Sequence, residues 1–246
     1  MPATDPPAIP LRPGADPGAE AVDPNGLVTR VSAPLLIPFL AADGRSDGTA
    51  ILVCPGGGYG LLDWQSHVVR LAARLNPLGL AVLALRYRTA PPSTRVPDDA
   101  LDDLHAAIRL ASVHAAAWRI RPDRLIGLGF SAGANLLLRH VCTPDGSGLA
   151  GLALLCLWPH GQPVEAYRLR PPPPRTLLCV SEADPVAPVA FSRGIDAALR
   201  AAGGDSTLAT FAQGGHLAFN FRPDGTPEVD WTPAFLAWLA ARPAAA

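Results

Sequence analysis

Short apolar segments alternate with helix-like segments along most of this 246-residue chain. The runs 50–54, 80–85 and 125–130 are apolar almost throughout, and a stretch with apolar residues at helical spacing follows each of them. Such runs suit strands that are covered on both faces, and their alternation with helices favours a mostly parallel sheet. The pattern therefore predicts one α/β domain over residues 27–246, with helices on both faces of the sheet.

The same pattern places the individual elements. Residues 1–26 are rich in Pro, Asp and Gly and lack periodicity, which predicts a flexible or extended N-terminal segment. The strand expected at 35–40 contains Pro38, which cannot donate to a neighbouring strand, so this strand is expected at a sheet edge. Further strands are expected at 50–54, 80–85, 125–130, 149–158, 176–181 and 207–211, and helices at 64–75, 98–118, 132–141, 187–202 and 233–241.

Composition argues against several classes of function. The formal net charge is -1, with no basic cluster, which disfavours a nucleic-acid partner. No apolar run approaches the roughly 18 residues of a membrane span, and the N-terminus does not resemble a secretory signal. Neither an H-E-x-x-H motif nor a Cys/His pair at ligand spacing is present, so we expect no metal and no cofactor.

The spacing and surroundings of the cysteines bear on the cellular compartment of the protein. None of the four forms a C-x-x-C motif, and most lie in apolar runs that are expected to be strands. Buried, reduced thiols are typical of a cytoplasmic protein without a disulfide framework, which is the localisation we expect. The residues concerned are Cys54, Cys142, Cys156 and Cys179.

Residues 129–133 (Gly-Phe-Ser-Ala-Gly) form a G-x-S-x-G motif between an expected strand and an expected helix. Where a strand turns this sharply into a helix, the central residue takes strained backbone angles and its side chain projects above the sheet. Flanking glycines avoid collisions, and the helix N-terminus offers free N–H groups. An ordinary helix N-cap serine is the alternative. The strand–turn–helix context favours Ser131 as a nucleophile.

A second glycine-rich segment, 55–59 (Pro-Gly-Gly-Gly-Tyr), follows the strand expected at 50–54. Three glycines let the backbone approach a ligand closely, and a loop at this position can supply oxyanion N–H groups. Gly56, Gly57 and Gly58 are therefore candidate oxyanion-hole donors, together with the N–H of Ala132. A phosphate cradle is the alternative, but neither G-x-G-x-x-G nor G-K-[ST] occurs here.

A serine hydroxyl needs a base, and the chain offers six histidines. His216 follows two glycines directly after the last expected strand, so its ring can turn over the sheet edge, and we interpret it as the base. His160 follows the strand expected at 149–158 and could border the site. The remaining four lie in expected helices and are interpreted as structural: His67, His105, His114 and His140.

An acid is needed to orient the imidazole and stabilise its charged form. With this motif the acid comes between the nucleophile and the base along the chain. Asp184 occupies that place, after the strand expected at 176–181, and Glu182 in the same loop is the runner-up. The alternative for both is a polar loop at a strand end.

Taken together, these motifs resemble the α/β-hydrolase esterases of the acetyl xylan esterase and hormone-sensitive-lipase type. The resemblance covers roughly residues 31–246. It implies an α/β-hydrolase fold, a serine carboxylesterase activity that in this family is often directed at acetylated sugars, and a structural role for Asp103. The segments that carry it are 54–59 (Cys-Pro-Gly-Gly-Gly-Tyr), 85–91 (Leu-Arg-Tyr-Arg-Thr-Ala-Pro), 129–133, 184–186 (Asp-Pro-Val) and 215–216 (Gly-His).

The chain also departs from these esterases in three places. Pro55 stands where the glycine segment often begins with His, Ala134-Asn135 where Gly-His is common, and Leu217 where Gly often follows the histidine. The last two departures bear on substrate preference more than on the Ser, His and Asp candidates.

The expected loops also describe the cleft. The Pro-rich N-terminal segment and the Pro-rich loop 159–175 are poor material for a helical cap, which predicts minimal or no cap and an open cleft with a small acyl pocket. Four apolar residues next to the motifs are candidates to line it, with plain core packing as the alternative. They are Tyr59, Leu62, Trp64 and Trp158.

Three functions follow from these candidates. The leading one is hydrolysis of a small-molecule ester with a short acyl chain, including acetylated sugars, by Ser131, His216 and Asp184. An amidase or formamidase on the same scaffold is the second, and no residue decides between the two. A non-catalytic small-molecule receptor is the third, and the presence of candidates for both base and acid disfavours it.

Overall fold

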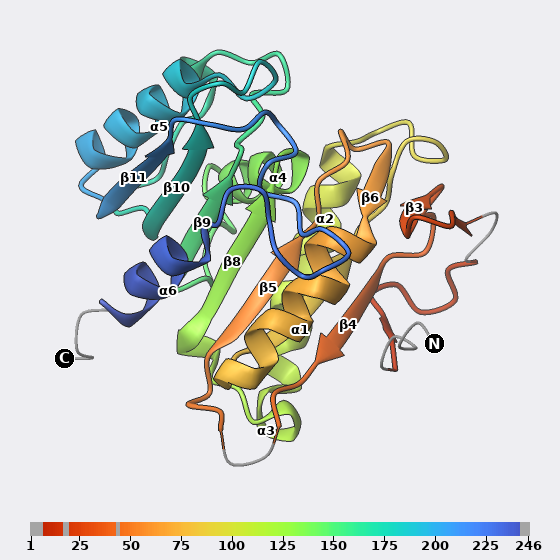
Figure 1. Ribbon diagram of the computed structural model, residues 1–246. Coiled ribbons are helices and arrows are strands. Elements are labelled where there is room, and N and C mark those ends of the chain that lie inside the picture. Colours follow the sequence, from red (N-terminus) through yellow and green to blue (C-terminus); the bar gives the residue numbers. More distant parts are fainter. Residues whose placement is uncertain (1–6, 17–19, 43–44, 242–246) are drawn as a thin grey trace.

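An eight-stranded sheet forms the centre of the structure (Figure 1). The computed structural model describes residues 7–16, 20–42 and 45–241. The strand order is β1-β4-β7-β5-β8-β9-β10-β11, and the six strands from β7 to the β11 edge run parallel. At the other edge, β4 pairs antiparallel with β7, and β1 pairs antiparallel with β4. Their bounds are Ile9–Pro10 (β1), Leu35–Phe39 (β4), Ala50–Cys54 (β5), Ala81–Arg86 (β7), Leu125–Phe130 (β8), Gly151–Leu155 (β9), Arg175–Ser181 (β10) and Ser206–Phe211 (β11).

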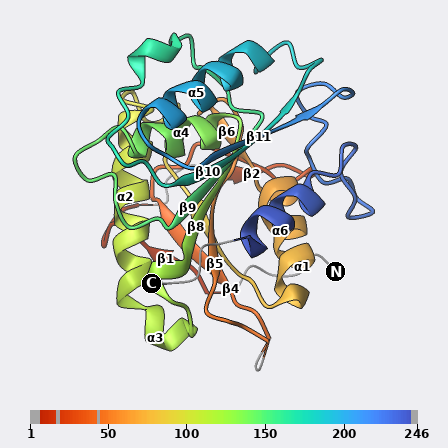
Figure 2. The same cartoon turned by 90° about the vertical axis from the view of Figure 1, so that its left-hand side faces the viewer.

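Helices cover both faces of this sheet, as predicted. Seen along the sheet, α1 and α6 lie on one face and α2, α3 and α4 on the other (Figure 2). Helix α5 packs on β10 and β11 at the far edge. The helices span Leu71–Leu75 (α1), Asp98–Val113 (α2), Ala115–Trp118 (α3), Ala132–His140 (α4), Val189–Ala201 (α5) and Thr232–Ala240 (α6), with short 3₁₀ turns at Asn76–Leu78 (η2), Pro122–Arg124 (η3) and Val164–Ala166 (η4).

Most elements lie where the sequence predicts them, and the differences have local causes. The helix expected at 64–75 begins as a π-helix, η1 (Gln65–Arg70), before it continues as α1. The helix expected at 98–118 is divided between α2 and α3, and Arg119 ends it in the left-handed conformation. Strand β4 was expected at the sheet edge, but β1 pairs with Leu35 and Leu36 outside it.

The N-terminal segment, predicted to be flexible or extended, forms short paired strands in the part that the structure describes. Besides β1, the short strand β2 (Ala21–Val22) pairs with β3 (Leu27–Thr29), which pairs in turn with β6 (Leu61–Asp63) to form a small antiparallel sheet. Glu20 also accepts a 2.8 Å hydrogen bond from Arg86. Strand pairing gives the backbone N–H and C=O groups of this segment hydrogen-bond partners, and composition does not reveal such pairing.

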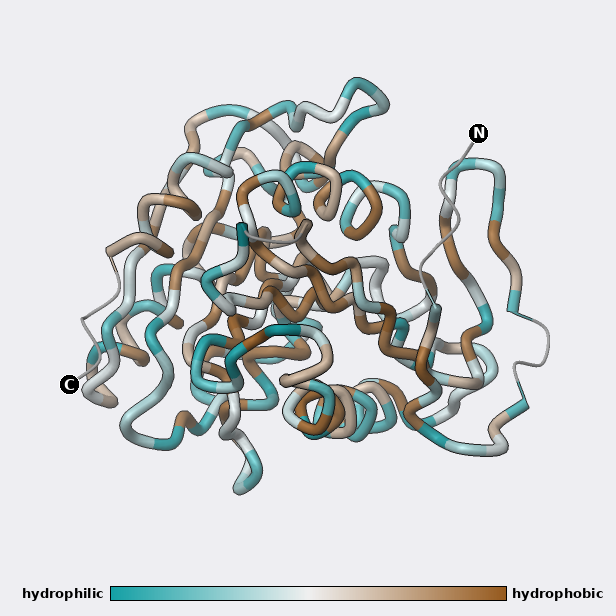
Figure 3. The backbone as a smooth tube through the Cα atoms, turned by 90° about the horizontal axis from the view of Figure 1, so that it is seen from below, coloured by the Kyte–Doolittle hydropathy of each residue, from teal (hydrophilic) through white to brown (hydrophobic). Residues whose placement is uncertain are grey.

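The apolar residues gather in the central strands, while the outer loops are largely hydrophilic (Figure 3). Strands β5 and β8 are buried along their whole length, as expected for parallel strands covered on both faces. The four cysteines are free, and burial raises the pKa of Cys142 to about 11. Among the described residues, no helix is both long enough and apolar enough to cross a bilayer.

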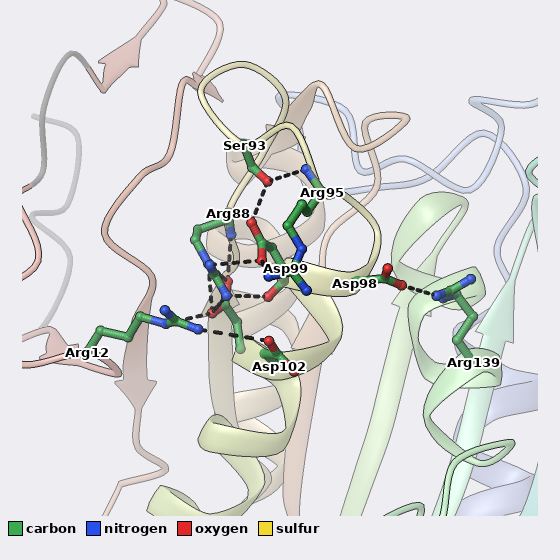
Figure 4. A network of polar contacts seen from close by, with 9 residues as sticks. Arg12, Arg88, Ser93, Arg95, Asp98, Asp99, Asp102 and Arg139 are labelled. Carbon is green, nitrogen blue, oxygen red and sulfur yellow. Dashed lines mark hydrogen bonds and ion pairs between the residues drawn. The ribbon is translucent and has the colours of Figure 1, made fainter.

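A polar cluster ties the end of β7 to the start of α2 (Figure 4). The guanidinium of Arg88 donates to both carboxylate oxygens of Asp103 at 2.8–3.0 Å, and the Arg88 backbone N–H donates to the same carboxylate at 3.0 Å. Asp103 is only 1% exposed. Asp99 adds a second ion pair with Arg88 at 3.2 Å. This bidentate geometry supports the structural role that the resemblance implies for Asp103.

We expect Asp103→Asn to destabilise the protein by about 3 kcal/mol, because it leaves the largely buried guanidinium of Arg88 without its main countercharge. Urea unfolding followed by circular dichroism measures this change. The matched control is Asp123→Asn, which breaks a 2.6 Å pair with Arg121 on the exposed surface and is expected to change stability little. Equal effects of the two substitutions would contradict the prediction.

A second prediction concerns pH and the buried imidazole of His140. Burial, and next the neighbouring His105, lowers the pKa of His140 to about 4. Unfolded histidine binds a proton near pH 6.5, so between these values the unfolded chain holds more protons than the folded protein. The contribution of His140 is therefore fully present above pH 6.5 and is lost as the pH falls towards 4, by up to about 3 kcal/mol.

This loss is measured as the free energy of unfolding at pH 7 and at pH 4.5. We expect His140→Phe, which cannot titrate, to flatten the dependence relative to the unmodified protein. Burial lowers the pKa of His67 and His105 as well, so part of the slope is expected to remain. An identical pH dependence of the free energy of unfolding in the two proteins would contradict the prediction.

Candidate active site

Ser131 lies at the sharp turn between β8 and α4. Its φ of 51° and ψ of -112° place it in a sparsely populated backbone region, and its N–H donates to the carbonyl of Leu155 on β9 at 2.9 Å. A non-glycine residue at positive φ is strained and persists only where the surroundings impose it. The strain turns the hydroxyl out of the strand and leaves it at the C-terminal end of the sheet.

The two glycines of the motif make this turn possible. A Cβ on Gly129 would lie 2.5 Å from the Gly133 carbonyl, and a Cβ on Gly133 would lie 1.9 Å from the carbonyl oxygen of Cys54. Both distances are far inside van der Waals contact, so α4 can approach β5 and β8 this closely only if neither residue has a side chain. The close approach seats the start of α4, and its free N–H groups, beside Ser131.

Three predicted residues from distant parts of the chain meet here. The His216 Nε2 atom lies 2.9 Å from the Ser131 hydroxyl, and the His216 Nδ1 atom lies 2.8 Å from an Asp184 carboxylate oxygen. Asp184 follows β10 and His216 follows β11, so parallel strands bring all three to one edge of the sheet. Glu182 points elsewhere, since it pairs with Arg193 at 3.4 Å on the exposed surface.

The surroundings of Asp184 keep it ionised. Burial favours its protonated form, but the hydrogen bond from His216 and those from the backbone N–H groups of Ala187 and Val186 prevail and hold its pKa below the usual range. A carboxylate accepting from Nδ1 fixes the proton of His216 on that nitrogen. The Nε2 atom is then free to accept the proton of the Ser131 hydroxyl.

The glycine loop (Gly56–Gly58) borders the same space. Gly57 has a φ of 143° and Gly58 a φ of 61°, and a Cβ on Gly57 would lie 2.1 Å from the Leu61 carbonyl oxygen. The N–H groups of Gly57 and Gly58 donate to no other part of the chain that the structure describes, nor does the N–H of Ala132 at the first position of α4. These three can receive a developing oxyanion.

Gly56 requires a correction to the predicted set of donors. Its N–H donates a 3.0 Å hydrogen bond to Nδ1 of His67, so it is not available to an oxyanion. Gly56 still lines the cavity, and a Cβ on it would lie 3.2 Å from both the His67 ring and the Ser131 Cβ. No local pattern indicates this partner, because His67 belongs to a later, helical segment.

A cavity of about 440 Å³ opens over Ser131. Trp158 lines it as predicted, whereas Tyr59, Leu62 and Trp64 are buried outside its wall. The indole of Trp64 instead lies 4.3 Å beneath the guanidinium of Arg86. Most of the other lining side chains are apolar, namely Leu27, Leu61, Cys156, Val186 and Leu217. Three polar residues cluster near β6: Asp63, His67 and Asn220.

Asn135 on α4 holds the two walls of the cavity together. Its side-chain oxygen accepts from the Tyr59 hydroxyl at 2.9 Å, and its side-chain N–H₂ donates to the Trp158 carbonyl at 3.0 Å and to the Tyr167 hydroxyl at 2.7 Å. Tyr59 is thus a support behind the glycine loop rather than a substrate contact. His160, a candidate border residue, packs edge-on against Tyr59 and Trp158 and does not line the cavity.

His67 is the main residue of this region that sequence reasoning missed. It is only 4% exposed, stacks on Phe130 with ring centroids 4.0 Å apart, and is hydrogen-bonded to Asn220 through Nε2 at 2.9 Å. Burial lowers its pKa, against the opposing influence of Asp63. The histidines expected to be structural, His105, His114 and His140, lie outside the cavity wall. No cluster of potential metal ligands occurs within the described ranges 7–16, 20–42 and 45–241.

Comparison with known proteins identifies the fold that carries this site. A model of the alpha/beta hydrolase fold family matches residues 51–168. An acetyl ester-xyloside bifunctional hydrolase from Caldicellulosiruptor lactoaceticus superposes with a TM-score of 0.72 at 24% identity, over 95% of each chain. The chain has the α/β-hydrolase fold. A thermophilic esterase from Thermogutta terrifontis shares it, with a TM-score of 0.65 at 22% identity, over 93% of this chain and 90% of that one.

Two curated sequences resemble this chain more locally. An acetylxylan esterase from Xylanibacter ruminicola is 32% identical over 89 residues, which is 36% of this chain and 18% of that protein. An acetyl-hydrolase from Streptomyces hygroscopicus is 35% identical over 135 residues, which is 55% of this chain and 39% of that protein. The chain thus spans less than half the length of these relatives. The resemblance to esterases of the acetyl xylan esterase and hormone-sensitive-lipase type is confirmed.

The predicted fold is confirmed too. Among the described residues, the loop between β9 and β10 holds only the three-residue turn η4, so no helical cap covers the cavity from that side. Leu27 of β3, the first residue of the predicted domain, forms part of the cavity wall.

Proposed function

We propose that this protein is a serine carboxylesterase that hydrolyses short-chain acyl esters through an acyl-enzyme, with acetylated sugars among its substrates. The observation that carries the proposal is the hydrogen-bonded chain from the Ser131 hydroxyl through His216 to Asp184, at 2.9 and 2.8 Å. A strained serine, a neutral imidazole and an ionised carboxylate in this order are what nucleophilic acyl transfer requires.

In the first step, the Ser131 oxygen attacks the ester carbonyl while His216 Nε2 takes its proton. The carbonyl oxygen becomes an oxyanion, which the N–H groups of Gly57, Gly58 and Ala132 are positioned to receive. Collapse of this intermediate expels the alcohol, and His216 returns the proton to it. The products are the acylated Ser131 and a free alcohol.

In the second step, water replaces the alcohol. His216 removes a proton from the water as it attacks the acyl carbonyl, and the same N–H groups stabilise the second oxyanion. Ser131 then leaves with the proton from His216, and the acid is released. Asp184 stabilises the imidazolium in both steps without being protonated.

The cavity supports a preference for short acyl chains. Its volume of about 440 Å³ has to hold both the acyl group and at least part of the alcohol. Trp158, Val186 and Leu217 provide apolar wall, and the names of the relatives, an acetylxylan esterase and an acetyl-hydrolase, point in the same direction. A series of p-nitrophenyl esters from acetyl to octanoyl is expected to give the highest kcat/KM at the short end.

Labelling with a fluorophosphonate probe tests the proposal directly. We expect the unmodified protein to take up one equivalent on Ser131, located by peptide mass spectrometry, and Ser131→Ala to take up none. Ser112→Ala, on the outer part of α2, serves as the serine control and is expected to label fully. An inert unmodified protein would favour a receptor. Faster hydrolysis of a formyl-amide than of p-nitrophenyl acetate would favour an amidase.

A further inference from the structure

The glycine loop leads through β6 into a π-helix, η1, an element that is rare and tends to mark functional positions. It faces the segment that follows His216. The Ser66 hydroxyl accepts from the Phe221 N–H at 2.8 Å, and Arg70 donates to the Phe221 carbonyl at 2.8 Å. Two successive turns of η1 therefore hold the backbone that carries His216.

Between these anchors, four hydrogen bonds form a closed ring. The Gly56 N–H donates to His67 Nδ1 at 3.0 Å, and His67 Nε2 lies 2.9 Å from the Asn220 side-chain oxygen. The Asn220 N–H₂ donates to an Asp63 carboxylate oxygen at 2.8 Å, and the Asp63 backbone N–H donates to the Gly56 carbonyl at 2.9 Å. The ring joins the glycine loop to the segment that follows His216.

The two ends of the side-chain path fix the direction of every bond in it. A backbone N–H can only donate, so His67 Nδ1 must carry a lone pair. An ionised carboxylate can only accept, so Asn220 must direct its N–H₂ to Asp63 and its oxygen to His67. The proton of His67 is therefore on Nε2, and the imidazole is neutral. A proton on Nδ1 would face the Gly56 N–H and break the ring.

The ring of hydrogen bonds lies next to the residues of the proposed reaction but does not contact the reacting atoms. The His67 imidazole stacks on Phe130, the residue before Ser131, with an interplanar angle of 5°. Gly56 lies between this imidazole and Ser131 and leads directly into Gly57 and Gly58. Any movement of His67 is therefore transmitted to the N–H groups that are proposed to receive the oxyanion.

We propose that neutral His67 is a positioning residue, which sets the glycine loop and the His216 segment in register for acyl transfer. The inference rests on the proposed function. This role predicts a loss in turnover rather than in substrate binding. Slightly misplaced N–H donors lose more of their stabilisation of the oxyanion than of the bound ester. Misplacement by about 1 Å can cost about 100-fold in rate.

Two substitutions separate the hydrogen bond from the packing. His67→Phe keeps a flat ring for the stack on Phe130 but has no acceptor for Gly56. His67→Asn places an amide oxygen near the position of Nδ1 and so retains that acceptor. His140→Phe is the matched control, because it replaces a buried histidine at the far end of α4, outside the cavity wall.

The assay is the hydrolysis of p-nitrophenyl acetate, with thermal unfolding measured on the same samples. We expect His67→Phe to lower kcat by about 10–100-fold with KM within about twofold, and His67→Asn to recover most of that loss. His140→Phe is expected to keep the unmodified kcat. Unchanged kcat in His67→Phe, or equal losses in the Phe and Asn variants, would overturn the proposal and leave His67 as a packing residue.

If His67→Phe does not fold, His67→Gln replaces it in the comparison. Glutamine can reach Asn220 but sets no acceptor at the Nδ1 position, so we expect it to be slower than His67→Asn, and the reverse order would overturn the proposal. Ser131→Ala is measured in parallel. Activity that survives Ser131→Ala would refute the proposed function itself, whereas an inactive Ser131→Ala beside a fully active His67→Phe would refute only the role of His67.

Discussion

Ser131→Ala is expected to lower kcat for p-nitrophenyl acetate by about 10⁶-fold while leaving the protein folded. The substitution removes one oxygen atom and keeps the backbone that α4 and β8 impose. His216 and Asp184 then have no nucleophile to activate, and only the oxyanion donors and substrate binding remain, which are worth about 10³–10⁴-fold over water. Steady-state kinetics with enzyme-free controls measures the loss.

A double variant sharpens this test. If Ser131 and His216 act as one unit, Ser131→Ala/His216→Ala is expected to be no slower than Ser131→Ala alone, because the effects of such residues do not add. Ser192→Ala, at a buried serine of α5 away from the cavity, is the control and is expected to retain full activity. Retention of more than a few per cent of kcat in Ser131→Ala would refute the assignment.

Gly133→Ala is expected to prevent the protein from accumulating in folded form. The added methyl group would lie 1.9 Å from the carbonyl oxygen of Cys54 and 2.7 Å from that of Pro55. Both obstacles are backbone atoms of the central strand β5 and its exit, so no rotamer change relieves the clash. Overpacking of a core usually costs about 1–3 kcal/mol, and a backbone collision that separates α4 from β5 is expected to exceed this range.

The control for this substitution is Gly60→Ala. Gly60 lies near the same cavity, but its added methyl would meet the Ala90 carbonyl oxygen at 3.6 Å and the Gly57 carbonyl oxygen at 4.0 Å, which are ordinary contacts. We expect Gly60→Ala to be soluble, with a melting temperature within a few degrees of the unmodified protein. The yield of soluble protein and its circular dichroism distinguish the two variants. A well-folded Gly133→Ala would contradict the prediction and show that α4 and β5 can move apart enough to hold a methyl group.

The sequence predicted those features that depend on local pattern. Strands β5 and β8 lie at the expected residues because continuous apolar runs between glycine-rich turns have few other solutions. Ser131, Asp184 and His216 were found because each follows its own strand, and parallel topology brings such positions to one edge. That step needs the order of elements along the chain but no knowledge of side-chain contacts.

The features that were missed depend on contacts between residues far apart in the chain. The partner of Gly56 was not predicted because a helical histidine such as His67 has no local sign of what it faces. Trp64 and Tyr59 are aromatic and near the glycines along the chain, which favours a place in the cavity wall, but neighbours along a chain can point to opposite sides of a loop. The pairing of β2 with β3 was hidden by the proline-rich composition of the N-terminal segment.

The arrangement around Asn135 has a practical consequence for redesign of the cleft. One amide serves residues that approach from opposite walls, through Tyr59 on one side and Trp158 and Tyr167 on the other. A library that randomises only one wall will therefore keep mostly those variants that still fit the unchanged opposite wall. Variants with a new acyl preference are best sought by changing both walls together while position 135 is held fixed.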